Sequence, residues 1–432
     1  MNYRDAIGFL YGLQTFGIKL GLRNITNVLQ EIGNPHKHFR TIHVAGTNGK
    51  GSTAALLESV LRTAGYQTGL YTSPHLFDFS ERIRVNGSPI PRRKVSKGVD
   101  LLKPYIERYR CTFFEAATAL AFHHFSQEEV DVAIVEVGLG GRLDATNILS
   151  PLCTIITDID HDHTEYLGHT LKQIAQEKAA VIKKHGTIIT SVNDPEILKV
   201  LQTVSRKQEA ALYPAAEHCT FRAKEMTSEG SRVDIQTPFH SYEGLRLSLP
   251  GEHQLRNLSA AILTLDILSE NGLPIRRKNV RDGVAGTIWP GRLQVLQRKP
   301  LFIVDGAHNP AGMRALKEAL KGLFTYEHLI LILGIMENKK YTEMVHSIVP
   351  IATHTIVTRP KMDRALNLQT LAQEVRTISN HVETTSTVSR AVKRAFQLAG
   401  PDDAVCAAGS LFLVGEIVRS KFGRADELFG LQ

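Results

Sequence analysis

The sequence predicts an α/β protein with two units, an N-terminal parallel-sheet domain with a small antiparallel excursion and a smaller C-terminal Rossmann-like domain. Three observations support this fold class. Short apolar strands alternate with helices along most of the 432 residues. A polar segment of alternating pattern interrupts this order at 215–250, and the order restarts after a Trp-Pro-Gly connector. A chain of this length also exceeds one ordinary core, so two domains are expected.

The first part of the chain is predicted to form a parallel β-sheet with helices on both faces. Strands are expected where β-branched runs end at glycine or turn residues, at 39–45, 68–73, 130–139, 151–160 and 187–192. The run VDVAIVEVGL is almost wholly apolar, as in a strand buried on both faces. Helices are expected between these strands at 52–65, 114–129 and 171–184. This alternation predicts βαβ units.

The remaining elements complete the two units. Segments SRVDIQT and LRLSLP alternate polar and apolar residues and predict antiparallel strands, followed by a helix at 253–270. After the connector, strands are expected at 301–307, 329–335, 354–358 and 403–410, with helices between them. We therefore expect one domain at 1–287, a linker at 288–297 and a second domain at 298–432. Two such domains in series place a cleft between them.

The composition is that of a globular protein and argues against membrane and nucleic-acid-binding classes. The chain is 43% hydrophobic and 22% charged, carries a net charge of +8, and has four scattered cysteines without a CxxC pair. It lacks an apolar run long enough for a bilayer, and its first residues lack a signal-peptide layout, so no membrane contact and a cytoplasmic location are expected. The basic residues are dispersed and no nucleic-acid reader motif occurs, so no nucleic acid is expected. The net positive charge agrees better with small anionic metabolites as ligands than with nucleic acid.

The stretch HVAGTNGKGST, residues 43–53, joins a strand to a helix. It departs from the G-x-x-x-x-G-K-[ST] loop, because Val44 stands where the first glycine belongs and Gly51 follows Lys50. Its chemistry is nevertheless that of a phosphate loop. Glycines allow close approach of the backbone, N–H groups at the helix start face the anion, and the lysine adds charge. The alternative is a glycine-rich turn with an exposed lysine.

Polar residues at other strand ends suggest further parts of a site. Glu136 ends an apolar strand, where a carboxylate would face the crevice and suit Mg²⁺, although it could equally pair with a lysine or a helix end. His161 and His163 form an H-x-H pattern that by itself also fits a zinc site or a pair of loop histidines. Asp305 and His308 follow the strand LFIV in the turn DGAHNP.

Several motifs in order resemble the folylpolyglutamate synthase/dihydrofolate synthase family of the Mur ligase superfamily. The likeness covers nearly the whole chain and is carried by GTNGKGS, YTSPHL, ERIRVNG, EVGLGGRLDATN, DHDHTEYLG, IAQEKAAVIK, WPGRL, DGAHNP and AAGSLFL. The resemblance implies a P-loop-type ATPase domain that binds ATP and folate, followed by a glutamate-ligase domain. Each motif is weak alone, and their shared order makes the likeness specific.

The resemblance also implies roles for individual residues. Those implied to bind ATP are Gly46, Thr47, Asn48, Gly49, Lys50, Gly51, Ser52, Thr53, Asn257, Arg292 and Asp305. Those implied to bind metal are Ser73, Glu136 and His163, and those implied to be catalytic are Lys50, Lys178 and His308. Those implied to contact the pteroate or glutamate are Thr112, Phe113, Phe114, Glu115, Leu143, Asp144, Ala145 and Ser410. From position alone, a helix cap or turn residue is the favoured interpretation of Asn309 and Ser410.

The resemblance further implies ATP, one or two Mg²⁺ ions and a carbamylated Lys178, and it is compatible with a monovalent cation. Without the family, Lys178 would be read as a solvated helical lysine. Two departures from the family pattern occur: EKAA stands where EKAG is usual, and GIMENKKY has Asn338-Lys339 in place of Asp-Lys. The second departure leads to no functional prediction.

The implied reaction is ATP-dependent addition of L-glutamate to a reduced folate, to dihydropteroate, or to both, through an acyl phosphate, in a monomeric ligase that forms ADP and phosphate. A Mur-type ligase acting on a cell-wall nucleotide precursor is the main alternative, and the SPHL and LDATN motifs argue against it. A kinase or nucleotide switch would not need the DGAHNP domain. A hydrolase built on His161 and His163 would leave the Lys50 loop unexplained.

Overall fold

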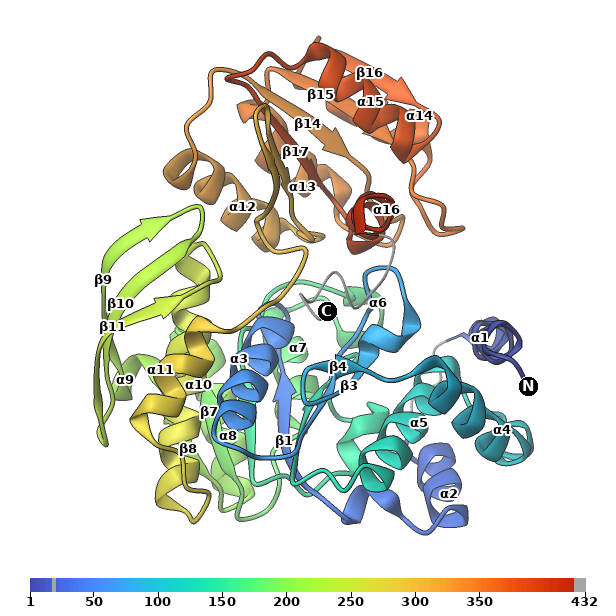
Figure 1. The fold of residues 1–432 in the computed structure, drawn as a ribbon, viewed down its shortest axis with the longest axis vertical. Coiled ribbons are helices and arrows are strands. Elements are labelled where there is room, and N and C mark those ends of the chain that lie inside the picture. Colours follow the sequence, from blue (N-terminus) through green and yellow to red (C-terminus); the bar gives the residue numbers. More distant parts are fainter. Residues whose placement is uncertain (18–20, 423–432) are drawn as a thin grey trace.

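The computed structural model describes residues 1–17 and 21–422 and arranges them as two α/β units, one above the other in Figure 1. The first unit runs from α1 to α11, and the second runs from Gly291, whose carbonyl accepts from the Gly306 amide, to α16. The helices of the first unit are α1 (Tyr3–Gly12), α2 (Arg23–Glu31), α3 (Lys50–Thr63), α4 (Arg92–Tyr109), α5 (Phe113–Gln127), α6 (Thr164–Leu167), α7 (Leu171–Ala179), α8 (Pro195–Lys207), α9 (Ala215–His218), α10 (Glu252–Glu270) and α11 (Arg277–Ala285). Those of the second unit are α12 (Pro310–Leu323), α13 (Tyr341–Ile348), α14 (Leu368–Arg376), α15 (Val388–Leu398) and α16 (Leu411–Phe422).

The main sheet of the first unit has eight strands within the described residues, in the order β4-β3-β2-β5-β1-β6-β7-β8. Strands β2, β5, β1, β6, β7 and β8 pair in parallel in that order. Strands β3 and β4 add an antiparallel edge beside β2. Their bounds are β1 (Arg40–Ala45), β2 (Thr68–Tyr71), β3 (Ile83–Val85), β4 (Ser88–Pro89), β5 (Val132–Glu136), β6 (Cys153–Ile156), β7 (Thr187–Thr190) and β8 (Ala211–Pro214).

Helices cover both faces of this sheet, which explains the unbroken apolar run in β5. Successive residues of a strand point to opposite faces. Ile134 packs in the core that holds Leu57 of α3, and Val135 packs in the core that holds Phe122 of α5. The parallel sheet buried on two sides, as predicted, follows from this alternation.

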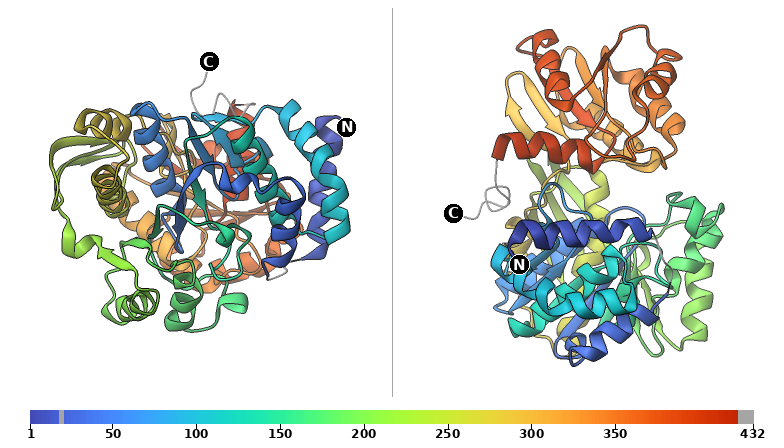
Figure 2. Two further views of the ribbon diagram at one scale, coloured as in Figure 1. Left: turned by 90° about the horizontal axis from the view of Figure 1, so that it is seen from below. Right: turned by 90° about the vertical axis from the view of Figure 1, so that its right-hand side faces the viewer.

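The predicted antiparallel excursion is confirmed as a separate three-stranded sheet of β9 (Thr220–Thr227), β10 (Gly230–Gln236) and β11 (Ser241–Leu247). Its inner residues, among them Val233 and Leu245, share a core with Leu258 and Ile262 of α10. The small sheet therefore lies against the long helix α10, at one side of the molecule (Figure 2).

The second unit is also α/β, as predicted. Its sheet runs β12-β13-β17-β14-β15-β16 in the described residues, and only β12 is antiparallel to its neighbour. The bounds are β12 (Gln294–Arg298), β13 (Leu301–Val304), β14 (Leu329–Leu333), β15 (His354–Thr358), β16 (Val382–Thr385) and β17 (Ala404–Ala408). Helices α12 to α14 cover one face and α15 and α16 cover the other. The predicted boundaries at 287 and 298 stay a prediction, and β12 begins at Gln294, inside the predicted linker.

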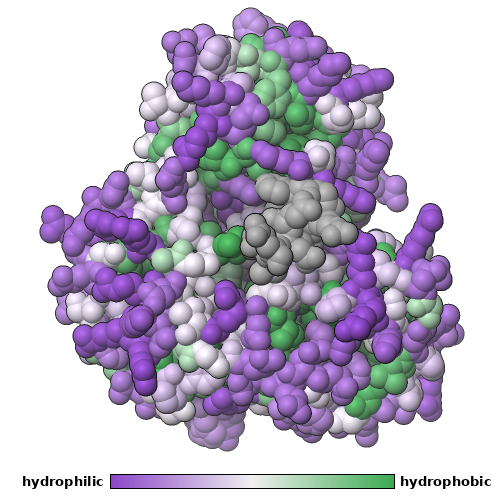
Figure 3. All heavy atoms as spheres, viewed as in Figure 1, coloured by the Kyte–Doolittle hydropathy of each residue, from purple (hydrophilic) through white to green (hydrophobic). Residues whose placement is uncertain are grey.

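Several element ends differ from the sequence predictions. Helix α3 begins at Lys50 rather than at Ser52, because Gly49 in the left-handed region (φ 81°) ends the preceding loop. Helix α7 ends at Ala179, five residues before the predicted end, and the chain turns there toward β7. In the described part of the chain, no helix combines the length and the apolar character needed to cross a membrane. The face shown in Figure 3 is mainly hydrophilic, with hydrophobic groups in separate patches.

Candidate active site

The loop between β1 and α3 is held tightly against the strand that neighbours β1. Gly46 and Gly49 have φ angles of 144° and 81°, which favour glycine. A Cβ would also clash at both positions, 2.0 Å from Thr157 Oγ1 at Gly46 and 2.3 Å from Asn257 Oδ1 at Gly49. The Thr47 amide donates to the Asp158 carbonyl at 2.8 Å. The glycines of the unusual loop are therefore required by close packing.

Lys50 is the first residue of α3, so its charge lies at the positive end of the helix. Its Nζ donates to the Thr47 carbonyl at 2.9 Å and lies 4.0 Å from Glu136 Oε1. The other Glu136 oxygen accepts from the Ser73 amide at 3.0 Å. Burial raises the pKa of Glu136, and Lys50 opposes that shift. Lys50, Ser73 and Glu136, predicted from separate motifs, thus lie together.

One cavity of about 410 Å³ lies between the two units and holds most of the predicted residues. It is lined from the first unit by the 46–52 loop, Ser73, Glu136, His163, Lys178 and Asn257, and from the second unit by Arg292, Asp305 and His308. Thr53 is the exception among the predicted ATP-binding residues, because it is fully buried below the loop and does not line the cavity. Asp305 accepts from the Leu293 and Ala307 amides and so shapes the turn that carries His308.

Lys178 is buried on α7 and its Nζ donates to the Gly46 carbonyl at 2.8 Å. The reading of this residue as a solvated helical lysine is therefore wrong. Burial, together with the nearby Lys50 charge, lowers the pKa of Lys178 to about 7. A large share of this amine is neutral near neutral pH.

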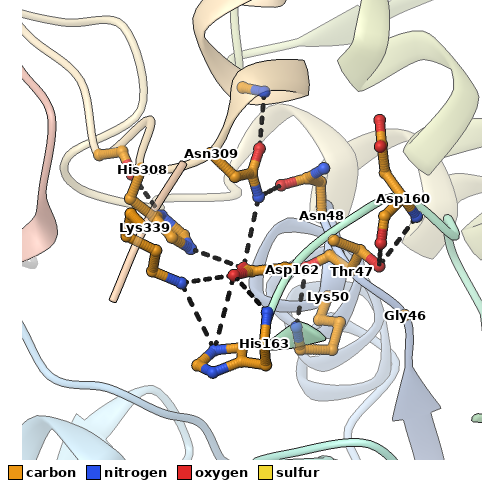
Figure 4. A network of polar contacts seen from close by, with 12 residues as sticks. Gly46, Thr47, Asn48, Lys50, Asp160, Asp162, His163, His308, Asn309 and Lys339 are labelled. Atoms are coloured by element: carbon orange, nitrogen blue, oxygen red, sulfur yellow. Dashed lines mark hydrogen bonds and ion pairs between the residues drawn. The ribbon is translucent and has the colours of Figure 1, made fainter. Parts of the chain in front are cut away.

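Asp162 is the centre of the polar network across the cavity (Figure 4). Its carboxylate accepts from Lys339 Nζ at 2.6 Å and lies 3.7 Å from His308 Nε2, and both partners come from the second unit. Lys339 Nζ also lies 3.5 Å from His163 Nε2. Burial alone would raise the pKa of Asp162, but Lys339 and the two histidines outweigh it and hold that pKa well below its usual range.

The two histidines of this network are uncharged at neutral pH. Burial, assisted by the Lys339 charge, lowers the pKa of His163 to about 4 and that of His308 to about 3. His308 Nδ1 lies 2.8 Å from the Gly306 carbonyl, so this nitrogen carries the proton and Nε2 faces Asp162 without one. His161, the other half of the H-x-H pattern, does not line the cavity, so only His163 of the pattern faces it.

Asp162 and Lys339 were not predicted from the sequence as site residues. Asp162 lies between the two histidines that drew attention, and Lys339 lies in the motif that departs from the family pattern. Both residues follow strand ends, β6 and β14, at the edge where ligands bind in α/β sheets. Their position after the ends of two parallel strands is the sequence feature that could have identified them.

The donor groups around the cavity fit Mg²⁺. Carboxylates from Glu136, Asp158, Asp160 and Asp162 line it, and oxygen is the ligand that Mg²⁺ prefers. Among the described residues, the only three-membered group of close His, Cys, Asp and Glu ligand atoms is Glu327, His328 and Asp403, which lies outside the cavity. The cavity therefore suits an ion held by one or two protein ligands together with phosphate oxygens, rather than a closed protein cage.

The residues predicted to contact the acceptor lie outside the cavity lining. Thr112 and Glu115 cap α5 reciprocally, and both are buried. Phe114 packs beneath Gly138, and Asp144 accepts from the Leu139 amide at 2.8 Å. These two side chains thus support the 138–140 turn, which does line the cavity. Leu143 and Ala145 flank Asp144, and Ser410 caps α16 through the Leu413 amide.

A second, smaller cavity of about 50 Å³ adjoins the same end of the sheet. It shares Gly51, Ser73, Glu136 and Arg292 with the main cavity and is closed by Trp289. Beside it, Arg82 donates to His75 Nδ1 at 2.8 Å and lies over the Phe113 ring. Phe113 thus lies next to this smaller cavity rather than the main one.

Comparisons with known proteins agree with this geometry. Residues 44–265 match the Mur ligase middle domain, and residues 291–411 match the Mur ligase glutamate ligase domain. A dihydrofolate synthase/folylpolyglutamate synthase of Bacillus subtilis is 38% identical over 358 residues, covering 81% of this chain and 83% of that protein.

Two solved structures cover almost the whole chain. A folylpolyglutamate synthase from Thermotoga maritima has a TM-score of 0.85 and 34% identity, with 99% of both chains covered. A Mycobacterium tuberculosis folylpolyglutamate synthase complexed with ADP has a TM-score of 0.91 and 28% identity, with 98% and 99% covered. The chain belongs to the Mur ligase family and, within it, to the folylpolyglutamate and dihydrofolate synthases.

Proposed function

We propose that this protein is an ATP-dependent ligase that forms an amide between L-glutamate and a folate, with ADP and phosphate as the other products. The observation that carries the proposal is the single cavity in which Lys50, Glu136 and Lys178 of the first unit face Arg292 and His308 of the second. The family supports the same reaction. A carboxylate is a poor acyl donor, so ATP is required to convert it into a group that an amine can displace.

The 46–52 loop would bind the phosphates of ATP. Its glycines bring the backbone close, the N-terminus of α3 directs N–H groups at the anion, and Lys50 provides a positive charge. Arg292 lines the same cavity from the second unit and can bind phosphate oxygens with its planar fork. Asn257 lies against the loop and would contact the nucleotide. Holding the groups in line and neutralising charge would supply most of the catalysis.

The folate carboxylate would attack the γ-phosphate and form an acyl phosphate. The amine of glutamate would then attack the acyl carbon and release phosphate. His308 presents an unprotonated Nε2 to the cavity, because Nδ1 is bound to the Gly306 carbonyl. The nucleophile is the neutral amine, and we propose that this nitrogen accepts the proton that the glutamate nitrogen loses once it has bonded to the acyl carbon, where its N–H is far more acidic than in the free ammonium. Asp305 keeps the His308 turn in place.

A first Mg²⁺ would be held by Glu136 and Ser73 and a second by His163, and both would neutralise charge on the transferring phosphate. His163 can serve as a ligand because its low pKa keeps it neutral. In the present arrangement the Lys339 ammonium lies 3.5 Å from His163 Nε2, so this side chain would move when His163 binds a cation. A monovalent cation is part of the same proposal.

We propose that Lys178 is carbamylated. Its lowered pKa supports this, because only a neutral amine reacts with CO₂. The reaction forms an N–C bond, releases a proton and turns a buried cation into an anion beside the Gly46 carbonyl and Lys50. An anion at this position would attract Lys50 and the metal rather than repel them.

The acceptor end of the site would lie toward the smaller cavity, near Ser73 and Trp289. Of the proposed pteroate-contacting residues, Phe113 lies next to this smaller cavity, whereas Phe114 and Asp144 lie beneath the 138–140 turn. Ser410 would contact glutamate. The Bacillus subtilis relative carries both synthase names. We propose that this chain accepts dihydropteroate as well as reduced folate, and that it works as a cytoplasmic monomer.

Release of ADP tests the proposal. Purified protein with ATP and Mg²⁺ should form ADP only when L-glutamate and either a tetrahydrofolate or dihydropteroate are both present. Separate assays with each acceptor test whether both activities occur. Equal ADP formation without any pteroate, or formation only with a cell-wall nucleotide precursor, would contradict the folate assignment.

A further inference from the structure

The Asn309 side chain forms hydrogen bonds in both units, one through its oxygen and the other through its nitrogen. It is the N-cap of α12, and its Oδ1 accepts from the Gly312 amide at 2.8 Å. Its Nδ2 donates to Asn48 Oδ1 at 2.8 Å and lies 3.5 Å from Asp162 Oδ2. The residue is 2% exposed. Because the cap occupies the oxygen, only the amide nitrogen is directed toward the first unit (Figure 4).

Asn48 is held from both units at once. The Asn48 carbonyl accepts from Thr157 Oγ1 at 2.6 Å, and its Nδ2 donates to Asp158 Oδ2 at 3.2 Å. These two bonds stay within the first unit. The bond to Asn309 is the contact that joins Asn48, a residue of the 46–52 loop, to the second unit. A change in the separation of the units would therefore stretch or break this bond to Asn48.

Charged pairs lie on either side of this contact. Lys339 is 2.6 Å from Asp162, and Arg314 of α12 is 3.3 Å from Asp160. They bring the second unit toward the first through charge, which acts over a range of distances. A neutral amide bond acts only at short range and with defined direction. Asn309 is thus the member of this group that fixes where the 46–52 loop lies when the units meet.

We propose that Asn309 is a positioning residue that couples closure of the two units to the nucleotide loop through Asn48. This inference rests on the proposed function, since it takes the 46–52 loop as the ATP site. If closure of the two units raises the affinity of the loop for nucleotide by some factor, then bound nucleotide raises the ratio of closed to open protein by the same factor. Losing one neutral hydrogen bond should reduce that factor about tenfold at most.

Two variants remove the contact of Asn309 with Asn48 and keep the capping of α12. Asn309→Ser and Asn309→Asp both keep an oxygen that can cap α12, and both remove the Nδ2 donor. Asp adds a carboxylate next to Asp162 and should act more strongly. The matched control is Asn367→Ser, because Asn367 caps α14 in the same unit, accepts from the Gln369 and Thr370 amides, and is exposed away from the cavity.

The test measures nucleotide affinity and the separation of the units in the same proteins. Affinity for a fluorescent ATP analogue with Mg²⁺ is measured by titration. Separation is measured by spin labels on Lys199→Cys in α8 and Lys393→Cys in α15, and the four native cysteines are buried and stay unlabelled. Wild type and Asn367→Ser should bind equally and shorten the label distance when nucleotide is added.

Asn309→Ser should bind the analogue three- to tenfold more weakly, and Asn309→Asp more than tenfold more weakly, with a smaller nucleotide-dependent change in distance. Asn309→Ser should keep a single cooperative melting transition, which shows that the cap of α12 is intact. In steady state, KM for ATP should rise more than kcat falls. Equal affinity and equal closure in all four proteins would overturn the inference. If wild type itself binds no nucleotide, the proposed function fails instead, and the two results cannot be confused.

Discussion

The Lys339 ammonium of the second unit lies 2.6 Å from the Asp162 carboxylate of the first, and the two side chains are only 8% and 10% exposed. The residues are 177 positions apart in the chain. A buried pair of this kind contributes little net stability when intact, but it is costly to break because one charge is left without its partner. The pair therefore ties the stability of the interface to the charge on both residues.

Breaking the pair should destabilise the protein. Asp162→Asn leaves the Lys339 charge buried, and we expect the free energy of unfolding to fall by about 3 kcal/mol. The double variant Asp162→Asn with Lys339→Gln should recover most of that loss. Lys340→Gln is the control, because Lys340 is exposed and pairs with Glu343 on the surface. Urea unfolding followed by circular dichroism measures all four proteins, and a loss below about 0.5 kcal/mol in Asp162→Asn would contradict this reading.

Stability should fall in acid partly because of His308. Its pKa is about 3 in the folded protein and about 6.5 in the unfolded chain, so between these values the unfolded state binds more protons. Stability from this residue is therefore complete above about pH 6.5 and decreases as pH falls toward 3. We expect the difference between wild type and His308→Asn to change by about 1.4 kcal/mol per pH unit below pH 6. Melting temperatures from pH 7.5 to 4.5 measure this difference, and parallel curves would show that His308 is not neutral when folded.

Lys178 should carry a carbamate. Because its pKa is about 7, the neutral amine increases through neutral pH, and so should carbamate formation. A protein sample equilibrated with ¹³C-bicarbonate should give one carbamate carbon signal that is lost in Lys178→Ala. Activity should fall at least 100-fold in this variant and recover partly with acetate or formate, which supply the missing carboxylate. Lys183→Ala is the control, since Lys183 binds the Asn147 carbonyl outside the cavity. A signal that persists in Lys178→Ala would contradict the assignment.

Gly51 should not tolerate a side chain. A Cβ there would lie 2.5 Å from the Trp289 ring, which itself lies over Arg84. We expect Gly51→Ala to lower the free energy of unfolding by about 1–3 kcal/mol through this overlap. Trp289 is the one tryptophan of the chain, so its fluorescence reports the displacement directly. Gly322→Ala in α12 has open space around its Cβ and is the matched control. An unchanged emission spectrum in Gly51→Ala would show that the ring is not held by this contact.

Local patterns in the sequence were enough to predict the inner parallel strands of both large sheets, the small antiparallel excursion and the loop from Gly46 to Ser52. The strands toward the sheet edges, β3, β4, β8, β12 and β16, were not predicted. A strand, glycines and a helix start adjoin one another in the sequence, so their geometry follows from neighbouring residues. Glu136 was found because it ends an apolar strand. Lys178 was found through a motif, although its spacing from Ile174 and Ala175 places it on the buried face of its own helix.

Contacts between the units could not be predicted in this way. The bond from Asn309 to Asn48 joins residues 261 positions apart, and its existence depends on how the two units meet. From position, Asn309 was expected to be a helix cap, which it is, but its second partner was not foreseen. Thr112 and Glu115 show the reverse case: they were predicted to contact the acceptor, and they form a buried cap of α5 outside the cavity lining.

Transfer of oxygen from the acceptor to phosphate tests the central claim most directly. The acceptor is prepared with ¹⁸O in the carboxylate that becomes the amide, and the phosphate released with ATP, Mg²⁺ and L-glutamate is analysed by mass spectrometry. Attack of that carboxylate on the γ-phosphate, followed by displacement by the amine, predicts one ¹⁸O atom in each phosphate released. Phosphate without ¹⁸O, formed while the amide product accumulates, would contradict the acyl-phosphate route and the arrangement of Lys50, Arg292 and His308 on which it depends.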